Sequence, residues 1–219
     1  MPDRRSYGDS CGIARGLDVA GERWALLIVR ELVLGPKRFT DLREGLPNVS
    51  PDVLAQRLRD LERSGLIGRR KLPPPASARV YELTERGGEL EPVLHALGRW
   101  GSRVPLPEEP APLSPDALAV ALKTMFDPAA ATDRTGLYEL RFGEHAFTVR
   151  LHAGELDVAR DGAQAGAGAV GIDTDTGTLA ALLWHGGSID AAVDRGALRL
   201  HGSREELADF LKLFSAPTG

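Results

Sequence analysis

The chain has 219 residues, of which 42% are hydrophobic and 26% charged, a composition typical of a globular protein with one large domain or two small ones. Its apolar runs fall far short of the ~18 residues of a membrane helix, and its N-terminus leads into no apolar signal segment. We therefore expect a cytoplasmic protein with no membrane partner. The single cysteine, Cys11, excludes an internal disulfide and a cysteine-clustered zinc site.

Charge divides the chain into two halves. Residues 1–103 contain 18 Lys and Arg against 14 Asp and Glu, a net charge of +4, whereas residues 104–219 contain 9 against 17, a net charge of −8. The basic half is therefore the candidate for binding a polyanion. Five prolines between residues 104 and 115 predict an extended spacer. We expect an N-terminal domain over residues 1–103, a proline-rich linker over 104–113 and a C-terminal domain over 114–219.

The N-terminal half is predicted to be mainly helical, with one hairpin. Gly35-Pro36 ends an almost wholly apolar first helix, and Ser50 as N-cap with Pro51 in the first turn begins a third one. In chain order, the predicted elements are helices over residues 22–34, 39–45 and 50–64, strands over 67–72 and 79–83, and a last helix that Thr84 caps and that Pro92 kinks or divides.

The helix that begins at Ser50 has two faces on a helical wheel. Its predicted buried stripe consists of Val53, Leu54, Leu58 and Leu61. Opposite this stripe lie Asp52, Gln56, Arg59 and Arg63. An amphipathic helix with Gln and Arg on its outer face, preceded by a short helix and a tight turn, is typical of a helix-turn-helix that reads the major groove. The alternative is an ordinary solvated face.

Arg57 and Asp52 are expected to stabilise the structure rather than to contact DNA. Arg57 falls inside the apolar sector, where we expect a packed stem and a head group paired with an acid of a neighbouring helix. Asp52 lies in the first turn, where a carboxylate favours the helix dipole.

The hairpin that follows is basic. Arg69, Arg70 and Lys71 lie on its first strand and Arg79 begins the second. A basic hairpin directly after a recognition helix is typical of a winged helix, whose wing contacts the minor groove and the adjacent backbone. The alternative is solubilising charge on an exposed hairpin. The predicted DNA-binding residues are Ser50, Gln56, Arg59, Arg63, Arg69, Arg70, Lys71 and Arg79.

Several short motifs between residues 9 and 101 match those of one known family in order and spacing. They are CGIA at 11–14, LDVAGERW at 17–24, LIVREL at 27–32, GPKRF at 35–39, LR at 42–43, SP at 50–51, LAQRLRDLE at 54–62, GLI at 65–67 and YELT at 81–84. The chain resembles the HxlR family of winged-helix regulators, relatives of the MarR group. The resemblance implies a homodimeric transcription factor that binds double-stranded DNA at pseudo-palindromic operators. Glu22 and Asp52 depart from the family pattern, which usually has glycine and often has a basic residue at these positions.

The resemblance also bears on the dimer surface and on Cys11. The last predicted helix carries an apolar stripe, which consists of Leu90, Val93, Leu94, Leu97 and Trp100. This stripe is either part of the core of the domain or a surface that binds a partner. The resemblance implies a partner surface, shared with a helix around Ile13 and Leu17. Some members of the family use a cysteine at the position of Cys11 as a thiol sensor, which Arg15 would favour by stabilising a thiolate. The alternative is a small apolar residue at the dimer interface. Any disulfide would be intermolecular.

The acidic half is predicted to be α+β. Ser203 and Glu206 form a capping box at the start of the final helix. The predicted elements are a helix from Ser114, strands over 137–142, 146–152, 155–160, 169–173 and 197–200, and helices over 176–184 and 203–214.

Three motifs in this half resemble the end of sterol-carrier-protein type 2-like domains. They are DTGTLAALL at 175–183, GGSI at 186–189 and RGALRLHG at 195–202. The resemblance implies a sheet covered by helices on one face and a tunnel for a small apolar ligand. The residues that would line the tunnel, or else form simple core, are Phe126, Phe142, Phe147, Trp184, Leu211 and Phe214.

We find no metal-binding spacing among the histidines and no serine in a nucleophile elbow, so we expect no enzyme, no metal and no cofactor. The leading hypothesis is a dimeric, sequence-specific transcriptional regulator controlled by a small apolar ligand. The alternative is a lipid carrier or enzyme whose winged helix serves only dimerisation or protein interaction.

Overall fold

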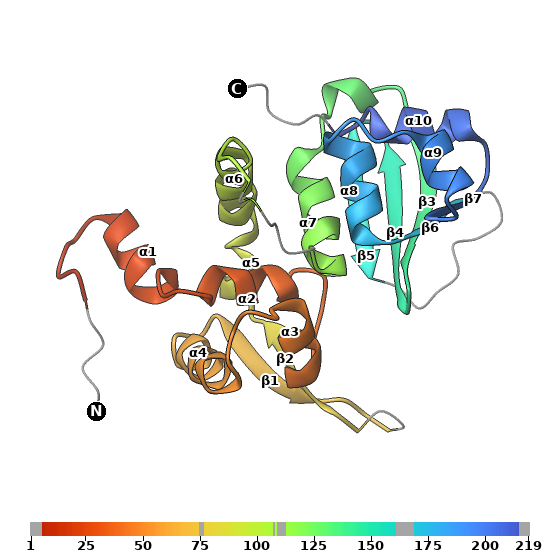
Figure 1. Ribbon diagram of the computed structural model, residues 1–219. Coiled ribbons are helices and arrows are strands. Elements are labelled where there is room, and N and C mark those ends of the chain that lie inside the picture. The colour runs from red at the N-terminus through yellow and green to blue at the C-terminus, as the bar shows by residue number, and fades with distance from the viewer. Residues whose placement is uncertain (1–5, 75–76, 107, 109–112, 161–168, 215–219) are drawn as a thin grey trace. The chain divides into compact units, whose positions relative to one another are not determined.

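The computed structural model describes residues 6–74, 77–106, 108, 113–160 and 169–214. The chain forms two compact units, Met1–Leu94 and His95–Gly219 (Figure 1). Half of the predicted linker, residues 107 and 109–112, lies outside the described residues. None of the helices that the described residues form is long and apolar enough to span a membrane.

The first unit consists of a helical body and a two-stranded wing. The helix-turn-helix and the hairpin occur where the sequence predicts them, and the Ser50 hydroxyl caps the third of the predicted helices by accepting a hydrogen bond of 3.4 Å from the Val53 amide. The elements are α1 (Gly12–Ala20), α2 (Ala25–Leu32), α3 (Phe39–Gly45), α4 (Pro51–Arg63), β1 (Ile67–Lys71), β2 (Arg79–Leu83), α5 (Glu85–Gly88) and α6 (Glu91–Gly101), the last of which continues into the second unit.

One predicted helix boundary needs correction. Helix α2 begins at Ala25 and not at Glu22, because Trp24 adopts a left-handed backbone conformation with φ of 77°, which a right-handed helix cannot include. The helix predicted after Thr84 is divided into α5 and α6, which is one of the two outcomes expected of Pro92, and Pro92 lies in the first turn of α6. Proline is tolerated in a first turn because its missing N–H has no partner there.

The core of the first unit lies between α2, α3 and α4. Its fully buried side chains include Ile28, Leu42, Leu54 and Leu58. Val53 is predicted to be buried, but it lies outside the core, since 40% of its surface is exposed. The buried stripe is centred on Leu54, Leu58 and Leu61, and at about 100° per residue Val53 falls roughly a quarter turn away from this centre.

A buried ion pair joins α2 to the wing. Glu31 and Lys37 are both buried, and the Lys37 ammonium lies 2.6 Å from the Glu31 carboxylate. The other oxygen of Glu31 accepts a hydrogen bond of 2.8 Å from Arg30. The backbone of Lys37 forms a two-bond bridge with Tyr81 of β2, at 2.9 and 2.8 Å. Residue 45 must be glycine in this geometry, because a Cβ atom there would collide with the Glu31 carboxylate.

The second unit contains a mixed five-stranded sheet and helices. The strand order is β5-β4-β3-β6-β7, in which only the β3–β6 pair is parallel. The elements after α6 are α7 (Pro115–Met125), η1 (Ala129–Ala131), β3 (Thr135–Phe142), β4 (His145–His152), β5 (Glu155–Arg160), β6 (Val170–Thr174), α8 (Thr176–Trp184), α9 (Ile189–Asp194), β7 (Leu198–His201) and α10 (Arg204–Leu211). The predicted strands and helices all occur, but α9 and the short η1 were not expected. Six residues with a Ser188 cap give too short a periodic pattern to identify α9 from sequence.

The register of the central strands divides the sheet into a buried and a polar face. The pairs Tyr138–Val149 and Leu140–Phe147 are buried, whereas Arg141 and Arg150 point to the opposite, exposed side. Alternation of this kind is expected of a sheet that packs on helices by one face.

The residues predicted to line a tunnel are buried or half-buried. Phe142, Phe147 and Phe214 are buried, and Phe126, Trp184 and Leu211 are half-buried. Ring centroids lie 6.0 Å apart in the Phe142–Phe147 pair and 6.2 Å apart in the Phe126–Phe214 pair. These contacts are those of packed core residues, and the tunnel stays a prediction.

The buried Glu31–Lys37 pair predicts that replacing one partner destabilises the protein more than replacing both. Lys37→Met removes the nearer cation from the buried Glu31 carboxylate and should lower the free energy of unfolding by about 3 kcal/mol. Urea unfolding followed by circular dichroism measures the loss. The double variant Glu31→Met/Lys37→Met removes both charges of the pair and should recover part of the stability, since Arg30 then loses its carboxylate partner. A double variant at least as unstable as Lys37→Met would contradict the assignment.

Candidate nucleic-acid interface

Helix α4 carries the polar face predicted to read DNA. Arg59 and Arg63 are exposed, and Gln56 is half-buried beside them. The hydroxyl of Ser50 lies at the N-terminus of the helix, where it is engaged as the cap. The exposed Asp52 lies in the first turn, as a carboxylate that favours the helix dipole would.

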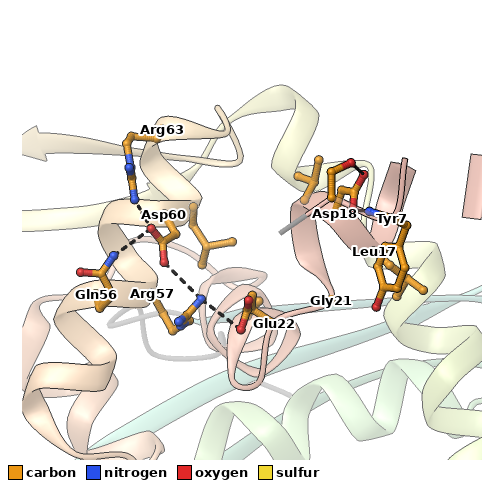
Figure 2. Close-up of a pocket in the computed structure, with 13 residues that line it drawn as sticks. Tyr7, Leu17, Asp18, Gly21, Glu22, Gln56, Arg57, Asp60 and Arg63 are labelled. Atoms are coloured by element: carbon orange, nitrogen blue, oxygen red, sulfur yellow. Dashed lines mark hydrogen bonds and ion pairs between the residues drawn. The ribbon is translucent and has the colours of Figure 1, made fainter. Parts of the chain in front are cut away.

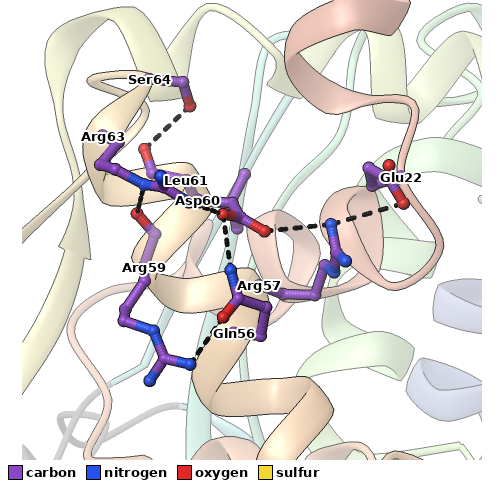
Figure 3. A network of polar contacts seen from close by, with 8 residues as sticks. All are labelled: Glu22, Gln56, Arg57, Arg59, Asp60, Leu61, Arg63 and Ser64. Atoms are coloured by element: carbon purple, nitrogen blue, oxygen red, sulfur yellow. Dashed lines mark hydrogen bonds and ion pairs between the residues drawn. The ribbon is translucent and has the colours of Figure 1, made fainter. Parts of the chain in front are cut away.

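The three predicted reading residues of α4 form one chain of polar contacts with each other and with Asp60 (Figure 3). The Gln56 amide donates a hydrogen bond of 2.9 Å to the Asp60 carboxylate and accepts one of 2.7 Å from Arg59. Arg63 pairs with the same oxygen of Asp60, and its Nε donates to the Arg59 carbonyl at 3.4 Å. Sequence reasoning missed Asp60, although its spacing of four residues after Gln56 and three before Arg63 places all three on one helix face.

Arg57 adopts the structural position expected of it. Its guanidinium lies 3.1 Å from the second oxygen of Asp60 and 3.4 Å from Glu22, in the turn before α2. Arg57 is half-buried, so its stem packs while its head group bridges two carboxylates.

The four basic residues of the wing fall into two pairs. Arg69 lies 3.1 Å from Glu62 and over the ring of Tyr81, and the Arg70 Nε contacts both oxygens of Glu82 at 3.0 and 2.9 Å. Lys71 and Arg79 are both exposed and lie opposite each other in the β1–β2 register. Within the described part of the chain, neither has an ion-pair partner. Like charges in directly opposed positions repel, so these two side chains form the part of the wing best suited to bind an anion.

A pocket of about 750 Å³ lies beside the α4 contacts, inside the first unit (Figure 2). Asp18 forms part of its far wall and accepts hydrogen bonds from the Ser6 hydroxyl at 2.8 Å and the Tyr7 amide at 2.9 Å. The near wall includes Arg57 and Asp60. Three or more His, Cys, Asp or Glu side chains arranged to hold a metal ion do not occur among the described residues.

Comparison with known proteins identifies relatives of the N-terminal half. Residues 19–109 match the family model described as HxlR-like helix-turn-helix. The HTH-type transcriptional regulator YvaP of Bacillus subtilis (strain 168) is 35% identical over 88 residues, which span 40% of this chain and 82% of YvaP. The HTH-type regulator YkvN of the same strain is 39% identical over 95 residues, spanning 42% of this chain and 78% of YkvN. The solved reduced form of the transcriptional regulator YodB from B. subtilis is 32% identical, with a TM-score of 0.40, and the match covers 46% of this chain and 100% of YodB.

The wing predicts opposite effects of one substitution on stability and on DNA affinity. Lys71→Glu turns a repulsive pair with Arg79 into an attractive one, so the melting temperature should stay the same or rise. The affinity for duplex DNA should fall at least ten-fold, and the salt dependence should become shallower by about one to two charges. Fluorescence anisotropy over a salt series and a thermal melt measure the two effects.

The matched control is Arg195→Glu, the same charge reversal at an exposed position in the second unit. It should leave DNA affinity unchanged. Equal losses of affinity in both variants would show that only net charge matters and would contradict the role of the wing.

Proposed function

Because the chain belongs to the HxlR-like helix-turn-helix family of transcriptional regulators, we propose that it binds pseudo-palindromic operators as a homodimer. The observation that carries the proposal is the outward face of α4, where Gln56, Arg59 and Arg63 lie together, followed by a wing with two opposed cations. A glutamine amide suits the adenine edge and a guanidinium suits the guanine edge in the major groove. Lys71 and Arg79 suit backbone phosphates.

The dimer is supported by apolar side chains that a single chain leaves in water. Helix α1 exposes 75% of Ile13 and 45% of Leu17, and helix α6 exposes 66% of Trp100 together with much of Val93 and Leu97. Exposed apolar stripes on helices are suited to pack against a second copy. Two-fold symmetry would then place two copies of α4 at half-sites about one helical turn of DNA apart.

Control by a small apolar ligand is the second part of the proposal. It rests on the resemblance of the C-terminal half to sterol-carrier-protein-like domains and on Trp184. The indole N–H of Trp184 is buried and has no hydrogen-bond partner among the described residues. An unpaired buried donor is a position where a ligand oxygen would be stabilised. Binding would shift the distance between the two copies of α4 and hence operator affinity.

An electrophoretic mobility shift on the DNA that flanks the protein's own gene tests the regulator. We expect sequence-selective binding with steep salt dependence, and Arg59→Ala should weaken it by about ten- to a hundred-fold, the usual value of one base contact. Lys212→Ala, an exposed cation on the second unit, is the control and should bind like wild type. Failure to bind at low salt would instead favour a lipid carrier or enzyme with the winged helix as an interaction module.

Ligand control has its own test. Native mass spectrometry of freshly purified protein should show a bound apolar molecule, and fatty acids or sterols should raise the melting temperature of wild type more than that of Trp184→Phe. The absence of both effects would leave the C-terminal unit with a structural role only.

Cys11 supports a further proposal, a thiol switch. The residue is exposed and precedes α1, and its amide donates to the Asp9 carboxylate at 2.9 Å. Peroxide or quinone treatment should weaken operator binding by wild type and leave Cys11→Ser unaffected. Equal responses of the two proteins would indicate that Cys11 serves only as a small residue at the dimer interface.

A further inference from the structure

We propose that Asp60 is a positioning residue that sets the base selectivity of α4, an inference that rests on the proposed DNA-binding function. We call Asp60, its direct partners and the two residues that contact those partners the Asp60 network. The network comprises Glu22, Gln56, Arg57, Arg59, Asp60 and Arg63 (Figure 3).

Both oxygens of Asp60 are engaged with donors on its own helix. One accepts from Gln56 at 2.9 Å and pairs with Arg63, and the other lies 3.1 Å from Arg57. Asp60 is only 26% exposed, so its carboxylate is set into the side of the helix rather than extended into solvent. A single carboxylate therefore fixes the positions of two side chains predicted to contact base edges.

The chemistry of a carboxylate also determines which way the Gln56 amide faces. An ionised Asp60 can only accept hydrogen bonds, so the NH₂ end of Gln56 must face it and the carbonyl end must face Arg59, at 2.7 Å. One amide hydrogen and one carbonyl lone pair remain unused. These are the donor and acceptor that a glutamine needs for a two-point contact with adenine.

Arg57 holds Asp60 in place from the opposite side. Its guanidinium bridges Asp60 and Glu22, so the network extends from α4 to the turn before α2. Because Arg57 is half-buried, its stem is held by packing, and the carboxylate of Asp60 has a fixed counter-ion independent of DNA. The reading side chains are thus ordered before DNA arrives, which reduces the conformational entropy lost on binding.

A negative charge on a helix that faces phosphates also repels DNA of every sequence. Asp60 should therefore weaken non-specific binding while it strengthens the discrimination between sequences. These two effects separate a positioning role from a purely structural role, in which loss of Asp60 would weaken all binding. They also separate it from simple repulsion, in which loss of Asp60 would strengthen all binding equally.

The experiment compares the full-length wild type with Asp60→Asn. The preferred site of the wild type is first obtained by selection from random duplex DNA, and dissociation constants for this site and for unrelated DNA are then measured at one salt concentration. We expect Asp60→Asn to bind unrelated DNA several-fold more tightly, and the ratio of specific to non-specific affinity to fall at least ten-fold. A repeated selection with the variant should relax the base preferences at a subset of positions.

Asp52→Asn is the matched control, because it removes the same charge from the same helix outside the Asp60 network. It should change both affinities together and preserve their ratio. Asp60→Glu keeps the negative charge but lengthens the side chain, so it should lower the ratio of specific to non-specific affinity without tightening non-specific binding. It replaces Asp60→Asn if that variant does not fold.

An unchanged ratio in the folded Asp60 variants would overturn the proposal while leaving DNA binding intact. Equal falls of the ratio in Asp52→Asn and Asp60→Asn would overturn it as well. Absence of DNA binding by the wild type would overturn the proposed function, and this inference with it, so the two failures are distinguishable.

Discussion

The first unit depends on the buried contact between Glu31 and Lys37. The side chain of Lys37 neutralises an acid of α2, while the backbone of the same residue pairs with Tyr81 of the wing. One residue therefore fixes the position of the hairpin on the helical body through two independent kinds of bond. A charge in this position is costly to desolvate and is stable only with its partner, so the wing cannot change its position on α2 without exposing or orphaning a charge.

Most charges on the proposed DNA-binding surface already have partners within the chain. Arg57 and Arg63 pair with Asp60, Arg69 with Glu62, and Arg70 with Glu82. Binding to DNA would exchange some of these contacts for contacts with phosphates and bases, while Lys71, Arg79 and the unused donor and acceptor of Gln56 would form new ones. This arrangement favours selectivity over bulk electrostatic attraction, in keeping with the modest positive charge of the N-terminal half.

Local signals allowed much of the fold to be predicted from the sequence. The caps Ser50, Thr84 and Ser203 act within one turn, so their positions follow from residue type alone. The start of α2 could not be predicted in this way, because a left-handed backbone at a tryptophan has no signal in residue type. Val53 was misassigned because the wheel shows direction but not which sectors a neighbouring helix covers. Asp60 was missed because the wheel assigns each residue to a sector and does not show that three donors of the same helix meet at one carboxylate.

The opposed Lys71 and Arg79 form a small site on the wing at which dissolved anions compete with DNA phosphates. Dissolved sulfate or phosphate would occupy it more strongly than chloride does, since a divalent anion neutralises both cations at once. Solutions of equal ionic strength but different anion valence would consequently yield different apparent operator affinities. The composition of the buffer, and not ionic strength alone, therefore becomes a variable of the DNA equilibrium.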